Sequence, residues 1–92
     1  MIELSDVLKR REGVLTQQAV DKTVLLNVTD GQYYALDEIS SRVWELCDGQ
    51  RNVGQVIDTI CQEYDAPAAT ISADVHELLE ELADAQLMVQ VR

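Results

Sequence analysis

Side chains able to do catalytic chemistry are few in this sequence and stand apart from one another. His76 is the only histidine, and Cys47 and Cys61 are the only cysteines. A protein zinc site needs about three or four His, Cys or carboxylate ligands together, and a nucleophile such as Ser40 or Ser41 needs a base beside it. We therefore expect His76 to be exposed and both cysteines to be reduced core residues. The sequence predicts a protein that is not an enzyme and carries no metal and no cofactor.

Acidic side chains are numerous and unevenly distributed. The chain has 17 Asp and Glu residues against 7 Lys and Arg residues, which gives a net charge of −10. Acids and bases cancel in residues 1–29, whereas no Lys or Arg occurs between Asn52 and Val91. Such a surface repels nucleic-acid phosphates and favours basic or neutral partners. A DNA-binding function is therefore disfavoured.

Many of the acids lie on a segment that we expect to form a helix from Thr70 or Ser72 to about Ala85. At about 100° per residue, its apolar side chains form one arc and its acidic side chains a second arc beside it. One interpretation is a solvated acidic face. The other is an apolar ledge that binds a basic partner, because acids at this spacing repel one another and no nearby base compensates them. The apolar arc comprises Ile71, Val75, Leu78, Leu79, Leu82 and Ala85, and the acidic arc Asp74, Glu77, Glu81 and Asp84.

Strand patterns precede the helices. Gly13–Gln18 is weakly patterned, whereas Lys22–Val28 is rich in β-branched residues and partly alternating. The dipeptide Asp30-Gly31 predicts a hairpin turn, because glycine tolerates the positive φ that such turns need. Gln32–Leu36 is then the returning strand, with one face formed by Tyr34 and Leu36 and the other by Tyr33 and Ala35. Residues 1–12 are polar and are expected to form a loose arm.

Capping residues mark where the first two helices begin. Asp37 is expected to cap a helix over Glu38–Cys47. Asn52, with Gln55 three residues later, resembles a capping box for a helix that ends near Tyr64, before Pro67. After the third helix, Leu87, Val89 and Val91 alternate in the manner of a short terminal strand.

These elements predict one α+β domain over residues 1–92. The expected architecture is winged helix-turn-helix-like, with a three-stranded antiparallel sheet followed by three helices. The N-terminus carries acids before bases and no apolar core segment, so it is not a signal peptide, and no apolar run is long enough to span a bilayer. We therefore expect a cytoplasmic location.

The stretch Gly31–Gly49, GQYYALDEISSRVWELCDG, is the most specific part of the sequence. Its strand that leads into a helix with a Trp and a final Asp-Gly resembles the PqqD-like family. Members are RiPP recognition elements, which hold the leader of a ribosomally synthesised precursor peptide for modifying enzymes. The resemblance continues through Arg51-Asn52-Val53, Val56–Tyr64 and the segment from Asp74 to Val89, and so covers roughly residues 13–91.

The resemblance implies a binding site for the leader peptide. In the family the leader docks antiparallel on the strand that corresponds to Gln32–Leu36, in the groove between that strand and the third helix. Which of the two tyrosines faces the groove stays open. At the matching positions, the expected leader-binding residues are Tyr33, Tyr34, Ala35, Leu36, Asp74, Val75, Leu78, Glu81 and Leu82.

Within the family, the Gly-x-Tyr-Tyr-x-Leu form is most similar to the stand-alone B1 protein of lasso peptide biosynthesis. The resemblance implies a partner, a B2-type cysteine-protease-like leader peptidase to which the chain delivers the precursor. Two alternatives stay open: a PqqD-type peptide chaperone for a radical-SAM maturase, and a protein-interaction adaptor that binds no leader. The peptidase would dock elsewhere, and Lys9-Arg10-Arg11 is either that surface or a solvated tail.

Overall fold

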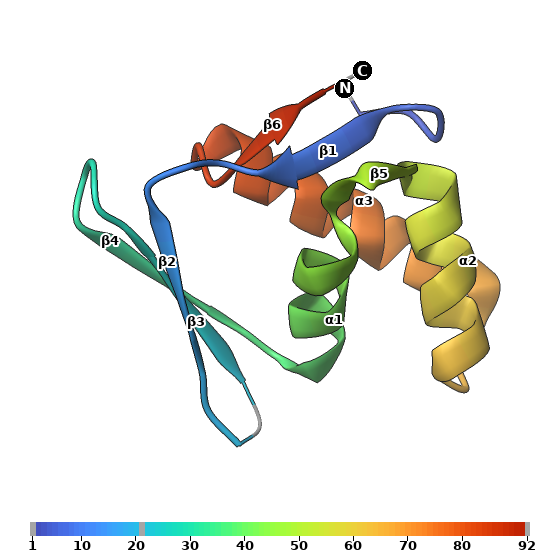
Figure 1. The fold of residues 1–92 in the computed structure, drawn as a ribbon. Coiled ribbons are helices and arrows are strands. Elements are labelled where there is room, and N and C mark those ends of the chain that lie inside the picture. The colour runs from blue at the N-terminus through green and yellow to red at the C-terminus, as the bar shows by residue number, and fades with distance from the viewer. Residues whose placement is uncertain (1, 21, 92) are drawn as a thin grey trace.

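Two small antiparallel sheets and three helices make up the protein. The computed structural model describes residues 2–20 and 22–91. In chain order the elements are β1 (Val7–Arg10), β2 (Val14–Gln18), β3 (Thr23–Asn27), β4 (Gln32–Leu36), α1 (Glu38–Leu46), β5 (Asp48–Asn52), α2 (Val53–Glu63), α3 (Ala68–Asp84) and β6 (Met88–Gln90). The sheet β2-β3-β4 projects to one side of the helices, and the sheet β5-β1-β6 lies across their other end (Figure 1). The α+β class is as predicted, whereas the winged helix-turn-helix label stays a prediction.

The projecting sheet is the three-stranded sheet that the sequence pattern predicts. β3 pairs with β2 on one side and with β4 on the other, in antiparallel register. Gly31 has a φ of +74° at the hairpin turn, and the carboxylate of Asp30 accepts a hydrogen bond from the backbone N–H of Gln32 at 2.9 Å. The turn therefore depends on both residues of the Asp-Gly pair.

The second sheet contradicts two expectations from the sequence. Residues 2–12, expected to belong to a loose arm over residues 1–12, do not form one: β1 pairs with both β5 and β6, and Val7 and Leu8 are buried. Met1 lies outside the described residues. Asp48–Asn52, expected to be a turn and a helix cap, is also a strand. Neither β1 nor β5 shows a strong apolar alternation in its sequence. Both are strands because they pair with segments that are distant in sequence, and a local pattern does not record such pairing.

The helices begin close to where their capping residues predict. Asp37 accepts from the N–H of Ser40 at 2.8 Å, and Asn52 and Gln55 form both bonds of the predicted capping box. α3 is longer than expected at its N-terminus, where it starts directly after Pro67. Pro67 is the N-cap, where extended backbone precedes the helix and no helical hydrogen bond requires its N–H.

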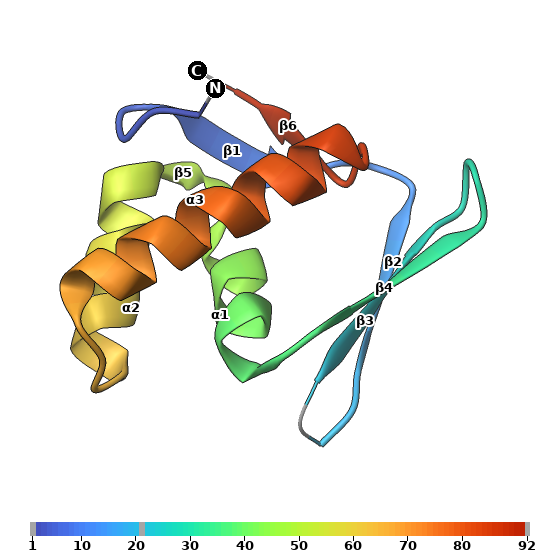
Figure 2. The ribbon, with the colours of Figure 1, turned by 180° about the vertical axis from the view of Figure 1, so that it is seen from behind.

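An unusual residue ends α3. Gln86 has a φ of +62°, in the left-handed region that glycine usually occupies. Two bonds complete a Schellman motif, from the N–H of Gln86 to the carbonyl of Ala83 and from the N–H of Leu87 to that of Leu82. The reversal turns Leu87 and Met88 into the core and leads the chain into β6. Figure 2 shows β6 returning beside the end of α3.

One continuous core joins the helices to both sheets. Trp44 is almost fully buried in this core, and the guanidinium of Arg10 lies over its ring, 6.0 Å from the centroid. Among the described residues, the indole Nε1 of Trp44 is the single fully enclosed side-chain nitrogen or oxygen without a hydrogen-bond partner. No helix in the described part of the chain is long and apolar enough to cross a membrane. Core members include Leu8, Leu25, Leu36, Val43, Val56, Ile60, Ile71, Val75, Leu79, Leu82, Leu87 and Met88.

The placement of β1 in the core gives a direct test of the second sheet. We expect Leu8→Ala to lower the free energy of unfolding by about 2–4 kcal/mol, because it removes buried methyl groups and leaves a cavity. The matched change Leu15→Ala, on an exposed leucine of β2, should cost less than about 1 kcal/mol. Urea unfolding monitored by the fluorescence of Trp44 measures both. Equal effects of the two substitutions would contradict the burial of β1.

Candidate functional site

A groove runs between β4 and α3, with α1 at its base. β4 lies at the edge of its sheet, and its sheet neighbour in the described structure is β3 alone. The backbone N–H and C=O groups on its other side therefore have no strand partner among the described residues. Of the eight residues that line the part of the groove next to β4, five are apolar or aromatic and three are polar. They are Tyr34, Ala35, Leu36, Asp37, Ser40, Leu78, Glu81 and Leu82.

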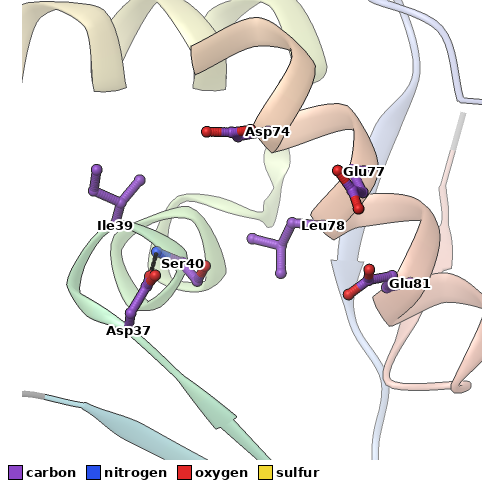
Figure 3. A pocket seen from close by; sticks show the side chains of 7 residues that line it. All are labelled: Asp37, Ile39, Ser40, Asp74, Glu77, Leu78 and Glu81. Carbon is purple, nitrogen blue, oxygen red and sulfur yellow. Dashed lines mark hydrogen bonds between the residues drawn. The ribbon is translucent and has the colours of Figure 1, made fainter. Parts of the chain in front are cut away.

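A second hollow continues the groove past the end of β4. It shares Asp37, Ser40, Leu78 and Glu81 with the first and adds Ile39, Asp74 and Glu77. In Figure 3, Leu78 points from α3 toward α1, and the carboxylates of Asp74, Glu77 and Glu81 surround it on the α3 side. The side chain of Ile39 is exposed here. The two hollows together form one groove whose far end is acidic.

The acids of α3 are free of the ion pairs that occur elsewhere in the described structure. Those pairs are Arg42 with Glu45 and Glu63, and Arg51 with Asp48. The two bonds from Arg42 to Glu63, each 2.8 Å, lower the pKa of the Glu63 carboxyl and raise that of the guanidinium. Arg42 and Arg51 therefore pair with acids of α1, α2 and β5, and the groove keeps its negative charge.

The structure brings together seven of the nine residues expected from the sequence to bind a leader. Two do not reach the groove. Tyr33 points to the opposite face of the sheet, where it lies opposite Leu26, and Val75 is buried in the core. The residues brought together are Tyr34, Ala35, Leu36, Asp74, Leu78, Glu81 and Leu82.

Four groove residues were missed by sequence reasoning. Asp37 was identified only as a helix cap, and Ser40 only as a serine without a base. Ile39 was not singled out, and Glu77 was placed in the acidic arc of the third helix but not among the leader-binding residues. All four lie in the groove because α1 begins directly at the end of β4, and no local pattern could reveal which part of α1 faces α3.

The outer face of the projecting sheet is a separate surface. Tyr33, Leu26 and Leu15 lie side by side across the three strands, and Tyr33 and Leu15 are exposed.

The basic residues near β1 do not form a free tail. Arg10 packs over Trp44, and Arg11 donates a hydrogen bond to the side-chain oxygen of Gln86 at 2.9 Å.

The histidine and the two cysteines, which were considered for catalysis or metal binding, lie in positions that do not favour either. His76 is partly buried rather than exposed, and its Nδ1 lies 3.0 Å from the carbonyl oxygen of Ser72. Both thiols are free, with Cys47 buried and Cys61 partly buried. Burial, with a smaller contribution from Asp48, raises the pKa of Cys47 to about 12. Within residues 2–20 and 22–91, no three His, Cys, Asp or Glu side chains cluster closely enough to hold a metal ion.

Comparison with known sequences finds one family. The family model described as "Coenzyme PQQ synthesis protein D (PqqD)" matches residues 22–88. A PqqA binding protein of Rhodopseudomonas palustris (strain HaA2) is 41% identical over 58 residues, which are 63% of this chain and 57% of that protein. The chain thus matches less than two thirds of the length of that relative. A PqqA binding protein of Xanthomonas axonopodis pv. citri (strain 306) is 39% identical over 80 residues, 85% of each protein.

Solved structures of similar fold include members of the same kind of protein. TbiB1 in complex with the TbiA(beta) leader peptide is 31% identical, with a TM-score of 0.78 over 87% of this chain and 93% of that one. The PqqD truncation of Methylobacterium extorquens PqqCD, described as a stand-alone RiPP recognition element, is also 31% identical, with a TM-score of 0.79 over 97% and 95%. A lasso peptide synthetase B1 complexed with the leader peptide, 17% identical with a TM-score of 0.79 over 89% and 96%, shows the fold alone.

The buried thiol predicts a specific dependence of stability on pH. Because the folded pKa of Cys47 is about 12 against a usual value of 9.0, the unfolded chain releases the thiol proton first as pH rises. Its contribution to stability is complete below about pH 9 and is lost toward about pH 12. We expect Cys47→Ala to flatten the decline of unfolding free energy over this range. Cys61→Ala is the control, and an unaltered slope in Cys47→Ala would contradict the assignment.

Proposed function

This chain belongs to the PqqD family, and from that premise we propose that it binds the leader of a ribosomally synthesised precursor peptide in the groove between β4 and α3. The predicted resemblance to RiPP recognition elements is confirmed by the family match and by the structures of similar fold. The family is one of non-catalytic recognition elements, in agreement with the prediction that the chain is not an enzyme.

The observation that carries this proposal is the edge of β4, unpaired in the described structure, beside a groove lined in part by apolar side chains. A peptide that adds as a strand forms backbone hydrogen bonds with the open edge, and these supply affinity without regard to sequence. Its alternate side chains then enter the groove, where Tyr34, Leu78 and Leu82 form an apolar lining. Specificity comes from the fit of those side chains. The groove is open along its length, as binding of an extended chain requires.

The consequence of binding is recruitment rather than catalysis. We propose that the chain delivers the bound precursor to a B2-type leader peptidase in lasso peptide biosynthesis. Tethering raises the effective concentration of the cleavage site at the peptidase, up to the millimolar range for a short flexible connection. The similarity to TbiB1, a protein solved with a leader peptide, favours this role.

A second role is favoured by a different observation. The curated relatives are PqqA binding proteins, and by analogy this chain would present a cofactor precursor peptide to a radical-SAM maturase. Both roles use the same groove and differ in the enzyme that receives the peptide. An adaptor that binds a folded protein and no leader is the alternative that would leave the groove unused.

The groove is tested by titrating labelled protein with a synthetic leader from the precursor gene nearest to its own. We expect NMR shifts concentrated in Gln32–Leu36 and Asp74–Leu82. Leu78→Asp should weaken binding by at least about tenfold, or about 1.4 kcal/mol, because it places a charge against the apolar part of the peptide.

The two tyrosines provide the matched control. Tyr34→Ala removes a groove side chain and should weaken leader binding, whereas Tyr33→Ala alters the opposite face and should change the affinity by less than about twofold. Equal losses for both variants, or an unchanged affinity in Leu78→Asp, would place the peptide elsewhere. Absence of any shift with leader peptides would favour the adaptor.

A further inference from the structure

The charge in the groove is not evenly distributed along its length. Beside β4 the groove is lined by Tyr34, Leu36 and Leu82, together with two carboxylates, one from each wall. Past the end of β4, the lining gains Asp74 and Glu77 and retains a carboxylate from each wall. One of these, Asp37, already accepts a hydrogen bond from the N–H of Ser40. The acidic end is therefore the end toward which β4 runs.

The acidic end combines charge with exposed apolar surface. Ile39 of α1 and Leu78 of α3 both line it, and the side chain of Ile39 is exposed (Figure 3). A lysine or arginine side chain fits this combination, because its methylene stem covers apolar surface while its head stays among the carboxylates. In the described structure none of the α3 carboxylates has an ion-pair partner that such a residue would have to displace.

The direction of the bound strand then fixes where a basic residue lies in the peptide. All strand pairs of the projecting sheet are antiparallel. Antiparallel pairing is also the more stable per residue and the more common arrangement. A strand added antiparallel to β4 runs from the Leu36 end toward the Gln32 end. Its N-terminal side therefore lies at the acidic end of the groove.

We propose that the groove selects a peptide of defined polarity: one or more Lys or Arg residues, followed directly by an apolar, strand-forming segment. This inference rests on the proposed function and specifies its substrate class. The apolar segment pairs with β4, and its side chains pack against the residues that line the groove there. The preceding basic residues lie between α1 and α3, among Asp74, Glu77 and Glu81.

A random-peptide display selection on the folded protein tests this polarity without knowledge of the natural precursor. We expect the enriched peptides to share an apolar segment with Lys or Arg on its N-terminal side. Enrichment of apolar segments with bases on the C-terminal side, or with no bases, would overturn the proposed polarity while leaving strand addition intact. Failure to enrich any peptide would count against the proposed function itself.

Charge-neutral variants then localise the selection. For an enriched basic peptide, the double variant Asp74→Asn with Glu77→Gln should weaken binding about five- to tenfold at low salt, and the loss should shrink as salt screens the charges. The matched variant Glu80→Gln with Asp84→Asn removes the same charge from the same helix at positions that line a different hollow. It should change the affinity less than about twofold. Equal losses in both double variants would show a general charge effect and overturn the assignment.

Discussion

Burial of one stripe of α3 is the interaction on which the rest of this structure depends. Ile71, Val75, Leu79 and Leu82 are all nearly inaccessible to solvent, in one core with residues of α1, α2 and β6. Once these four side chains are buried, the rotation of the helix is fixed. Leu78 then lies at the border of the stripe, facing the groove, and the carboxylates lie outside it. Because α3 cannot rotate about its axis, Leu78 and the carboxylates stay at the groove.

β4 performs two structural roles with alternating residues. Leu36 anchors the strand in the core and Tyr34 is partly buried on the same side, whereas Tyr33 is exposed on the opposite face. Because side chains alternate along a strand, a shift of one residue would exchange the two faces. The antiparallel register with β3 holds the strand in place and leaves its other edge open toward α3. An open edge is a liability in an isolated sheet, and a peptide-binding protein can use it.

The negative charge of α3 has a cost within the free protein. Acids three and four residues apart on one helix repel one another, each pair by a few tenths of a kcal/mol. The chain places its described ion pairs elsewhere, as in the bond from Arg42 to Glu63 that joins α1 to α2. A binding role for this surface, as proposed above, would offset that cost, because natural proteins often sacrifice some stability at functional sites.

The sequence by itself determined the local features of this protein. The turn at Asp30-Gly31, the cap at Asp37, the capping box at Asn52 and the apolar stripe of α3 follow from interactions within about four residues, and the structure has each of them. Most of the groove-lining residues could be named in advance because a family resemblance supplied the pairing of β4 with α3.

Only the tertiary structure decided the features that depend on distant parts of the chain. β1 and β5 have weak local patterns, and they are strands because β1 pairs with β5 on one side and with β6 on the other. The outward direction of Tyr33 was equally invisible, since both faces of β4 carry a tyrosine and the register decides which is buried. The acidic end of the groove forms because α1 lies beside α3. The two helices are adjacent because they share a buried core, and no local sequence pattern reveals that contact.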